Sequence, residues 1–233
     1  MTKTAIITGA SSGIGKAICE MLLNMDYEIY GIGRDFSGAA SLTANSAFHK
    51  VELDLLDTAK TTQTVRDLSK GKALDLLINC AGVGYYGLHD EIRPENISEL
   101  VRTNLETPLL LSNLLLKKLK ENKGTIINIA SITAGQSNPH GAAYGATKAG
   151  LLSFSKSLFD EVRKHGVKVT TILPDMTDTN LYRNADFEAS KEENARLVPQ
   201  DVADAVRYIL SADPHMVITE FTIRPQLHRI EKK

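Results

Sequence analysis

Short apolar runs alternate with longer segments of helical periodicity along this chain. Several runs, such as Thr-Ala-Ile-Ile at residues 4–7, lack alternating polar positions, which is typical of strands buried on both faces. The runs that predict strands cover residues 4–8, 28–32, 48–52, 74–79, 125–130, 168–173 and 216–223. The segments that predict helices cover residues 14–24, 58–69, 97–119, 143–165 and 199–211. This alternation predicts right-handed crossovers and a doubly wound parallel α/β sheet with helices on both faces.

The pattern contains no repeat, low-complexity tract or linker, so residues 1–233 are expected to form a single domain. The least patterned stretch is residues 175–197, which is polar and charged and lies between a predicted strand and a predicted helix. A connection of that length inside a compact domain is usually a lid or a mobile loop. We expect it to be the substrate loop.

Composition narrows the functional classes. Lys and Arg number 27 against 28 Asp and Glu, a net charge of -1, which argues against a nucleic-acid partner. The richest apolar stretch, residues 108–116, is too short to span a membrane and contains Ser112 and Asn113. The two cysteines, Cys19 and Cys80, lie in apolar segments and suit a reducing cytoplasm, which is the expected location.

A glycine-rich turn follows the first predicted strand and opens the first predicted helix. It reads Thr-Gly-Ala-Ser-Ser-Gly-Ile-Gly at residues 8–15, with the spacing G-x-x-x-G-x-G. Glycines there let a pyrophosphate approach the backbone, and the helix start supplies free N–H groups. The alternative is a simple strand–helix turn. The residues expected to contact a dinucleotide are Gly9, Ser11, Ser12, Gly13, Ile14 and Gly15.

The end of the second predicted strand bears on the choice of dinucleotide. An acid there binds the ribose 2′-hydroxyl of NAD(H), whereas an Arg favours the 2′-phosphate of NADP(H). The strand ends at Gly33, Arg34 follows, and Asp35 comes next. NADP(H) is therefore the preferred cofactor and NAD(H) the alternative, since a shift of one residue would place Asp35 at the ribose. Asp54, after the third strand, is either an adenine contact or a turn cap.

Small residues end the fourth predicted strand in the order Asn79-Cys80-Ala81-Gly82. Open α/β sheets bind ligands at the carboxyl ends of their strands, and small residues let the backbone lie close to a ligand. Asn79, Ala81 and Gly82 are therefore further candidates for the cofactor site.

Tyr144 and Lys148 lie four residues apart in a helical pattern and share one face. A neighbouring ammonium and an oxidised nicotinamide would both favour the phenolate and lower the pKa of Tyr144, which makes the pair a candidate general acid/base. Ser131 follows the fifth strand on the same sheet edge as the glycine-rich turn, and either polarises a carbonyl or caps a turn.

Together with Asn104, these motifs resemble the short-chain dehydrogenase/reductase family across essentially the whole chain. The resemblance implies a seven-stranded Rossmann fold and a catalytic tetrad of Asn104, Ser131, Tyr144 and Lys148. In the family the Tyr transfers the proton and the Ser polarises the carbonyl. The Lys holds the nicotinamide ribose and lowers the pKa of the Tyr, and the Asn supports a water in a proton relay.

Two departures from the family pattern stand out. After the sixth strand the family usually has Pro-Gly, whereas this chain has Pro174 and Asp175, which adds a charge near the expected nicotinamide. Pro174 and Thr179 still match the family's cofactor contacts. The second departure is the C-terminus, which lacks a glycine-rich tail and any familiar tetramer signature.

Pro108 lies four residues after Asn104 in the same helical pattern. Proline has no N–H, so it cannot donate to the carbonyl of Asn104 and should kink the helix. We expect this carbonyl to take another partner, such as a buried water.

The substrate is expected to be a small-molecule carbonyl or alcohol, with no metal. Candidate substrate contacts are Tyr85, Tyr86 and His140, and residues 136–140 lie in one of the expected loops. Helix 97–119 is apolar on more than one face, which predicts a homodimer or homotetramer packed through it. The alternatives to a reductase or dehydrogenase are an epimerase or dehydratase on the same fold, or a dinucleotide sensor without catalysis.

Overall fold

The main sheet has the parallel, seven-stranded architecture that the sequence predicts. The computed structural model describes residues 2–233. Seven strands form one parallel sheet in the order β3-β2-β1-β4-β5-β6-β8. The strands are β1 (Lys3–Thr8), β2 (Tyr27–Gly33), β3 (Phe48–Glu52), β4 (Leu76–Asn79), β5 (Thr125–Ile129), β6 (Lys168–Pro174) and β8 (Glu220–Ile223). The predicted doubly wound α/β fold is confirmed, and β8 is an edge strand.

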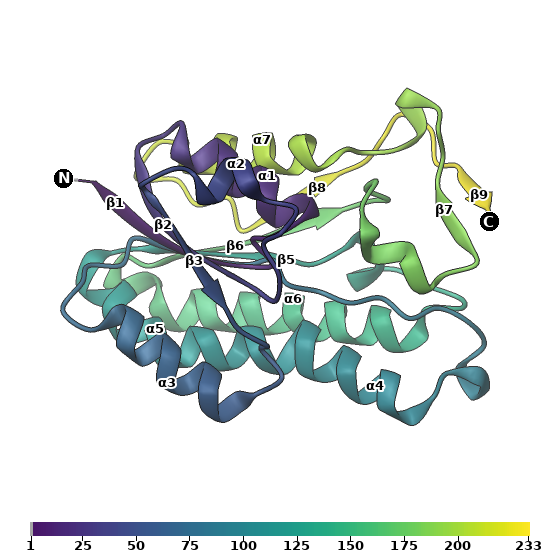
Figure 1. The fold of residues 1–233 in the computed structure, drawn as a ribbon, viewed down its shortest axis with the longest axis horizontal. Helices are drawn as coiled ribbons and strands as arrows, with labels where there is room; N and C mark the ends of the chain where they lie inside the picture. Colours follow the sequence, from purple (N-terminus) through teal and green to yellow (C-terminus); the bar gives the residue numbers. More distant parts are fainter. Residues whose placement is uncertain (1) are drawn as a thin grey trace.

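Helices cover both faces of this sheet (Figure 1). One layer contains α1 (Gly13–Leu23), α2 (Ala40–Thr43) and α7 (Pro199–Leu210), and the other contains α3 (Thr58–Ser69), α4 (Pro94–Val101), α5 (Thr107–Asn122) and α6 (Ala142–Val162). Successive residues of β1 point to opposite layers, because Ile6 belongs to one apolar core and Ile7 to the other. A strand that contributes to two cores has apolar residues at consecutive positions, which explains the absence of alternation in the sequence.

The predicted helix 97–119 is interrupted. α4 and α5 are joined by a π-helical turn at Arg102–Glu106, in which the N–H of Thr107 donates to the carbonyl of Arg102. Pro108 lies directly after this turn and has no N–H to continue regular α-helical bonding. The chain thus departs from regular α-helical bonding next to Pro108, in a π-helical turn, the kind of irregularity that occurs often at functional sites.

A second, two-stranded sheet was not predicted. Within residues 175–197, β7 (Phe187–Ala189) pairs antiparallel with β9 (Ile230–Lys232) near the end of the chain. We call residues 227–233 the C-terminal strap. The Glu231 carboxylate accepts hydrogen bonds from the N–H of Lys191 and the hydroxyl of Ser190, and the N–H of Lys233 donates to the carbonyl of Asp186. The C-terminal strap therefore holds the predicted substrate loop, residues 175–197, through strand pairing and hydrogen bonds.

Candidate active site

The site forms where the carboxyl ends of β1, β4, β5 and β6 meet. β1 and β4 are neighbours in the sheet, and chain order reverses between them, which is where open α/β sheets bind ligands. The hydroxyl of Thr8 at the end of β1 accepts hydrogen bonds from the N–H groups of Cys80 and Ala81, both at 3.0 Å. These bonds hold the glycine-rich turn beside the segment after β4.

The glycine-rich turn is folded too tightly for side chains at two positions. A Cβ added at Gly15 would lie 2.2 Å from the carbonyl oxygen of Gly9, and Gly9 has a φ of +69° and lies against Ala81. α1 then begins at Gly13 with no side-chain cap at Ser12 and no acidic residue in its first turn. Its N-terminal N–H groups and positive dipole end are left for an anionic ligand.

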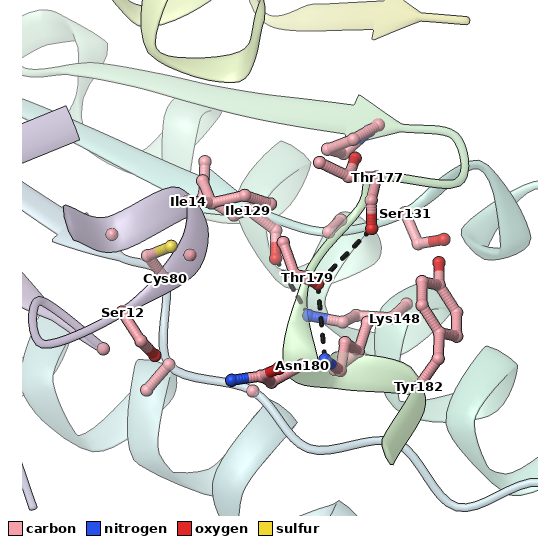
Figure 2. Close-up of a pocket in the computed structure, with 18 of the residues that line it drawn as sticks. Ser12, Ile14, Cys80, Ile129, Ser131, Lys148, Thr177, Thr179, Asn180 and Tyr182 are labelled. Atoms are coloured by element: carbon pink, nitrogen blue, oxygen red, sulfur yellow. Dashed lines mark hydrogen bonds between the residues drawn. The ribbon is translucent and has the colours of Figure 1, made fainter. Parts of the chain in front are cut away.

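A cleft of about 830 Å³, partly open to solvent, lies over this turn, and we call it the glycine-turn cleft. Figure 2 looks into it, with Ser12 and Ile14 on one side and Ser131 and Lys148 on the other. The predicted site residues that line it are Gly9, Ser12, Gly13, Ile14, Gly15, Ala81, Gly82, Ser131, Tyr144, Lys148, Pro174 and Thr179. The lining also includes Asp175, Thr177, Asn180, Leu181, Tyr182 and Arg183, which belong to the predicted substrate loop at residues 175–197. Cys80, Ile129 and Ala130 line the cleft as well and were not predicted as contacts.

Lys148 and Tyr144 are buried at the floor of the cleft. The ammonium of Lys148 donates to the carbonyl of Ile129 at 2.9 Å and lies 5.8 Å from the centre of the Tyr144 ring. Burial lowers the pKa of Lys148 to about 8. Burial also raises the pKa of Tyr144 to about 12, against a lowering by the Ser131 hydroxyl. In the chain alone, desolvation therefore outweighs the expected lowering of the Tyr144 pKa by Lys148.

Ser131 makes the turn cap that was one of its two predicted roles, and its place in the cleft leaves the other role open. Its hydroxyl accepts a hydrogen bond from the N–H of Thr133 at 3.2 Å, as a turn cap does. The residue nevertheless lines the glycine-turn cleft beside Tyr144. A hydroxyl that accepts from the backbone keeps its own proton for a ligand.

Asn104 lies behind the cleft rather than in its lining. It is fully buried in the π-helical turn, and its side-chain amide bonds to both backbone groups of Val83. A Cβ added at Gly82 would lie 3.5 Å from Asn104 Oδ1 and 3.7 Å from Lys148 Nζ. The side chains of Asn104 and Lys148 therefore both lie close to Gly82.

Several predicted cofactor contacts lie outside the cleft. Asn79 is buried and donates to the Asn128 side chain at 2.7 Å, and Asp54 is exposed and accepts from the N–H of Leu56 at 3.0 Å. Asp54 thus makes the turn cap that was its alternative assignment. Ser11 packs on the end of β2, where a Cβ added at Gly33 would lie 2.9 Å from the Ser11 hydroxyl.

Arg34 and Asp35 differ in how they are engaged. The Asp35 carboxylate accepts from the N–H and the hydroxyl of Ser37, at 2.8 and 3.0 Å, and these bonds lower the pKa of Asp35. Arg34 is exposed, and within residues 2–233 no hydrogen bond or ion pair holds its guanidinium. The Asp35 carboxylate is occupied by hydrogen bonds within its own turn, whereas the Arg34 guanidinium is available to a ligand.

A second cavity of about 1360 Å³, partly open to solvent, adjoins the first, and we call it the aromatic cleft. The ring of Tyr86 is 5.6 Å from that of Tyr144, 5.8 Å from that of Tyr182 and 5.1 Å from that of Phe187. Of the predicted substrate contacts, Tyr86 and His140 line this cleft, as do residues 136–139. Tyr85 does not, because its hydroxyl donates to Glu99 of α4 at 2.6 Å.

The C-terminal strap completes the aromatic cleft through His228, Ile230 and Lys232. This role could not be predicted from the sequence, because the strap carries no motif and its strand is three residues long. Its contacts with residues 182–194 exist only once the chain has folded.

Asp175 is accommodated without strain. Its φ is not in the left-handed region, so the position does not need the family's glycine. The side chain is buried, with Oδ1 accepting from the N–H of Met176 at 2.7 Å and lying 3.3 Å from Nδ1 of His228. Asp175 lines both clefts.

Comparisons with known proteins agree with this geometry. A family model described as short chain dehydrogenase matches residues 3–189. Serine 3-dehydrogenase from Rhizobium radiobacter is 30% identical over 235 residues, which cover 97% of this chain and 94% of that protein.

Two solved structures are similar over nearly the whole chain. The alcohol dehydrogenase of the archaeon Thermococcus sibiricus, complexed with 5-hydroxy-NADP, has a TM-score of 0.88 at 24% identity and covers 98% of this chain and 99% of its own. The 3-ketoacyl-(acyl-carrier-protein) reductase of Brucella melitensis, complexed with NADH, has a TM-score of 0.83 at 27% identity. It covers 95% of this chain and 96% of its own.

The chain belongs to the short-chain dehydrogenase/reductase family. It is an NAD(P)-dependent oxidoreductase. Within residues 2–233, no helix is long and apolar enough to cross a membrane. The same residues contain no group of three or more His, Cys, Asp or Glu side chains placed to hold a metal ion.

Proposed function

We propose that this protein is an NADP(H)-dependent oxidoreductase that interconverts a small-molecule ketone or aldehyde and the corresponding alcohol. The observation that carries the proposal is the convergence of Ser131, Tyr144 and Lys148 on one cleft with the uncapped start of α1. A proton donor, a carbonyl-polarising hydroxyl and an anion site are the parts that hydride transfer with a dinucleotide requires.

The residues of the glycine-turn cleft fit a nicotinamide dinucleotide. The first-turn N–H groups of α1 would hold the pyrophosphate, and Gly13, with a φ of +50°, presents no side chain there. Lys148 uses one of its three N–H donors on Ile129, which leaves two for the nicotinamide ribose. Ala81, Gly82, Pro174 and Thr179 would form the remaining wall.

The preference for NADP(H) rests on Arg34 and Gly33. Gly33 leaves no room for an acid at the strand end, because an added Cβ would meet Ser11 at 2.9 Å. The free guanidinium of Arg34 suits a 2′-phosphate, and the Asp35 carboxylate is occupied by Ser37. The solved relatives bind a derivative of NADP or NADH, so their ligands support either dinucleotide.

A nicotinamide bound in the glycine-turn cleft would supply hydride chemistry at the carbonyl carbon. Ser131 donates a hydrogen bond to the carbonyl oxygen, and Tyr144 gives a proton to that oxygen in reduction and takes it back in oxidation. Lys148 keeps positive charge near the Tyr144 ring and so favours the phenolate, and Asn104 holds the segment after β4 behind it.

We also propose that the protein is a homodimer or homotetramer that packs through α5, α6 and the turn before them. Val101 is 43% exposed, and Leu105 beside it is only partly buried against Gly150 of α6. Apolar side chains on this outer face would be covered by a second copy. Light scattering at micromolar concentration tests this, and an active monomer would contradict it.

The test of the proposed function is a spectrophotometric assay of NADPH oxidation with a panel of ketones and aldehydes. Tyr144→Phe should lower turnover by about 10²- to 10⁴-fold and leave dinucleotide affinity nearly unchanged. Tyr208→Phe is the matched control, because Tyr208 is 61% exposed and remote from the clefts. Full activity of Tyr144→Phe would refute the mechanism, whereas dinucleotide binding without turnover of any carbonyl would favour a sensor.

A further inference from the structure

The two clefts meet at four shared residues. Ser131, Tyr144, Asp175 and Tyr182 line both the glycine-turn cleft and the aromatic cleft. Under the proposed function, the reacting carbonyl lies beside Ser131 and Tyr144, so the boundary between the clefts is where chemistry takes place. Asp175 is therefore a carboxylate at the reacting centre.

This carboxylate has one oxygen without a protein donor. Asp175 is 7% exposed, and its Oδ1 has the N–H of Met176 and the imidazole of His228 as neighbours. Among residues 2–233, no backbone or side-chain group donates a hydrogen bond to Oδ2. Oδ2 is not among the buried polar atoms that lack a partner, so it is open to the cleft and free to accept a hydrogen bond from a ligand. A positively charged donor makes the stronger hydrogen bond to a carboxylate.

The surroundings of Asp175 also favour a cation. The rings of Tyr86, Tyr144, Tyr182 and Phe187 gather in the aromatic cleft, and the faces of aromatic rings attract positive charge. The basic residues of the cleft, His140, His228 and Lys232, are exposed and partly screened by water. His228 lies at Oδ1 of Asp175 and leaves Oδ2 for a ligand. The exposed Asp186 adds a second carboxylate there.

We infer that Asp175 selects substrates with a positively charged nitrogen on the carbon adjacent to the reacting carbon, that is, amino alcohols and the matching amino ketones. This inference rests on the proposed function and names the substrate class of that site. The ammonium group would pair with Oδ2 of Asp175 while Ser131 and Tyr144 face the neighbouring oxygen. The aromatic rings would take an apolar or aromatic substituent on the other side of the reacting carbon.

The test compares three alcohols that differ only in one terminal group. They are 2-amino-1-phenylethanol, which is cationic, 1-phenyl-1-propanol, which is neutral, and 3-hydroxy-3-phenylpropanoate, which is anionic. Each is titrated into the NADPH-bound protein and followed by NADPH fluorescence. An alcohol and the reduced cofactor cannot react, so the Kd values report binding alone.

The amino alcohol should bind about tenfold or more tightly than the neutral alcohol, the value of one desolvated ion pair of about 1.4 kcal/mol. The anionic alcohol should bind most weakly. Asp175→Asn keeps an acceptor for Met176 and should bring the ratio of the first two Kd values close to one. Asp186→Asn is the matched control and should leave most of the ratio in place. Asp175→Gly, which restores the residue usual in the family, should behave like Asp175→Asn and guards against misfolding of either variant.

Three results would overturn the inference. They are an unchanged ratio in both Asp175 variants, tightest binding of the anionic alcohol, and no binding of any of the three. A change in the ratio of NADP⁺ to NADPH affinity on Asp175→Asn, without a change in alcohol preference, would show that the carboxylate serves the nicotinamide instead. Because binding is measured without turnover, these results are independent of the ketone-reduction assay that tests the proposed function.

Discussion

The side-chain amide of Asn104 pairs with both backbone groups of Val83. Oδ1 accepts from the N–H of Val83 and Nδ2 donates to its carbonyl, each at 2.9 Å, and Nδ2 also reaches the Thr147 hydroxyl at 3.3 Å. These bonds fasten the π-helical turn to the segment after β4 and to α6. Asn104 thus positions two parts of the glycine-turn cleft. One is α6, which carries Tyr144, and the other is the segment of small residues after β4.

Asn104→Ala should destabilise the protein, because it leaves two buried backbone groups of Val83 without partners. The expected loss is about 2–4 kcal/mol, which corresponds to a fall in Tm of roughly 5–15 °C. Thermal unfolding followed by circular dichroism measures it. Asn113→Ala is the control, since Asn113 is exposed on α5 and should change Tm very little. Equal Tm values for the two variants would show that the Val83 contacts add no stability.

Gly15→Ala should impair dinucleotide binding, because the new Cβ would lie 2.2 Å from the Gly9 carbonyl and force the turn open. We expect the Kd for NADPH to rise by about tenfold or more, a cost of at least 1.4 kcal/mol. A fluorescence titration gives the Kd. In Gly38→Ala the added Cβ meets nothing within 4 Å, so the affinity should not change. If both variants bind NADPH like the wild type, the turn does not hold the pyrophosphate.

Arg34→Ala should weaken NADPH binding by about 10- to 100-fold and leave NADH binding almost unchanged, since only NADPH carries the 2′-phosphate. The comparison requires Kd values for both dinucleotides in both proteins. Arg66→Ala removes an equally exposed guanidinium from α3 and serves as the control. A parallel loss of affinity for NADH and NADPH would mean that Arg34 acts on overall charge rather than on the phosphate.

Lys148→Met should abolish most activity yet stabilise the fold at neutral pH. Burial lowers the pKa of Lys148 from its ordinary 10.5 to about 8 in the folded protein. The unfolded chain therefore binds more protons between pH 8 and 10.5, and the free energy of unfolding rises with pH across that window, by up to about 3 kcal/mol.

The variant has no such group, so its stability should lack this rise, and its advantage over the wild type should shrink from pH 7.5 to pH 10. Urea denaturation at both values measures the difference. The lost bond to the Ile129 carbonyl offsets part of the gain. Lys117→Met, at an exposed position of α5, should follow the wild type. A variant less stable than the wild type at pH 7.5 would indicate that Lys148 is not penalised by burial.

The sequence predicted the sheet well, because strands such as β1 have consecutive apolar residues that belong to two cores at once. It also located the break near Pro108, since a missing N–H is a property of the residue itself. Several residues that line the glycine-turn cleft were also predicted from properties of the local sequence. Gly9, Ser131, Tyr144 and Lys148 occur in local motifs whose places follow from strand ends and helix spacing.

What the sequence did not predict depends on contacts between distant segments. Short strands such as β7 and β9 have little pattern of their own and exist because they pair with each other. Tyr85 and Tyr86 are neighbours in sequence, yet one bonds to Glu99 and the other packs on Tyr144, a difference that only the folded chain decides. The pKa of Tyr144 was expected to be lowered, but burial dominates in the folded chain.

The strap at the end of the chain has a practical consequence for anyone who produces this protein. The last residue, Lys233, donates through its side chain to the carbonyls of Tyr182 and Ala185, beside the aromatic cleft. The start of β1 lies at the opposite end of the molecule from β9 (Figure 1). A bulky group attached to the strap would crowd the cleft mouth and distort measured substrate affinities, whereas one attached at the start of β1 would leave it accessible.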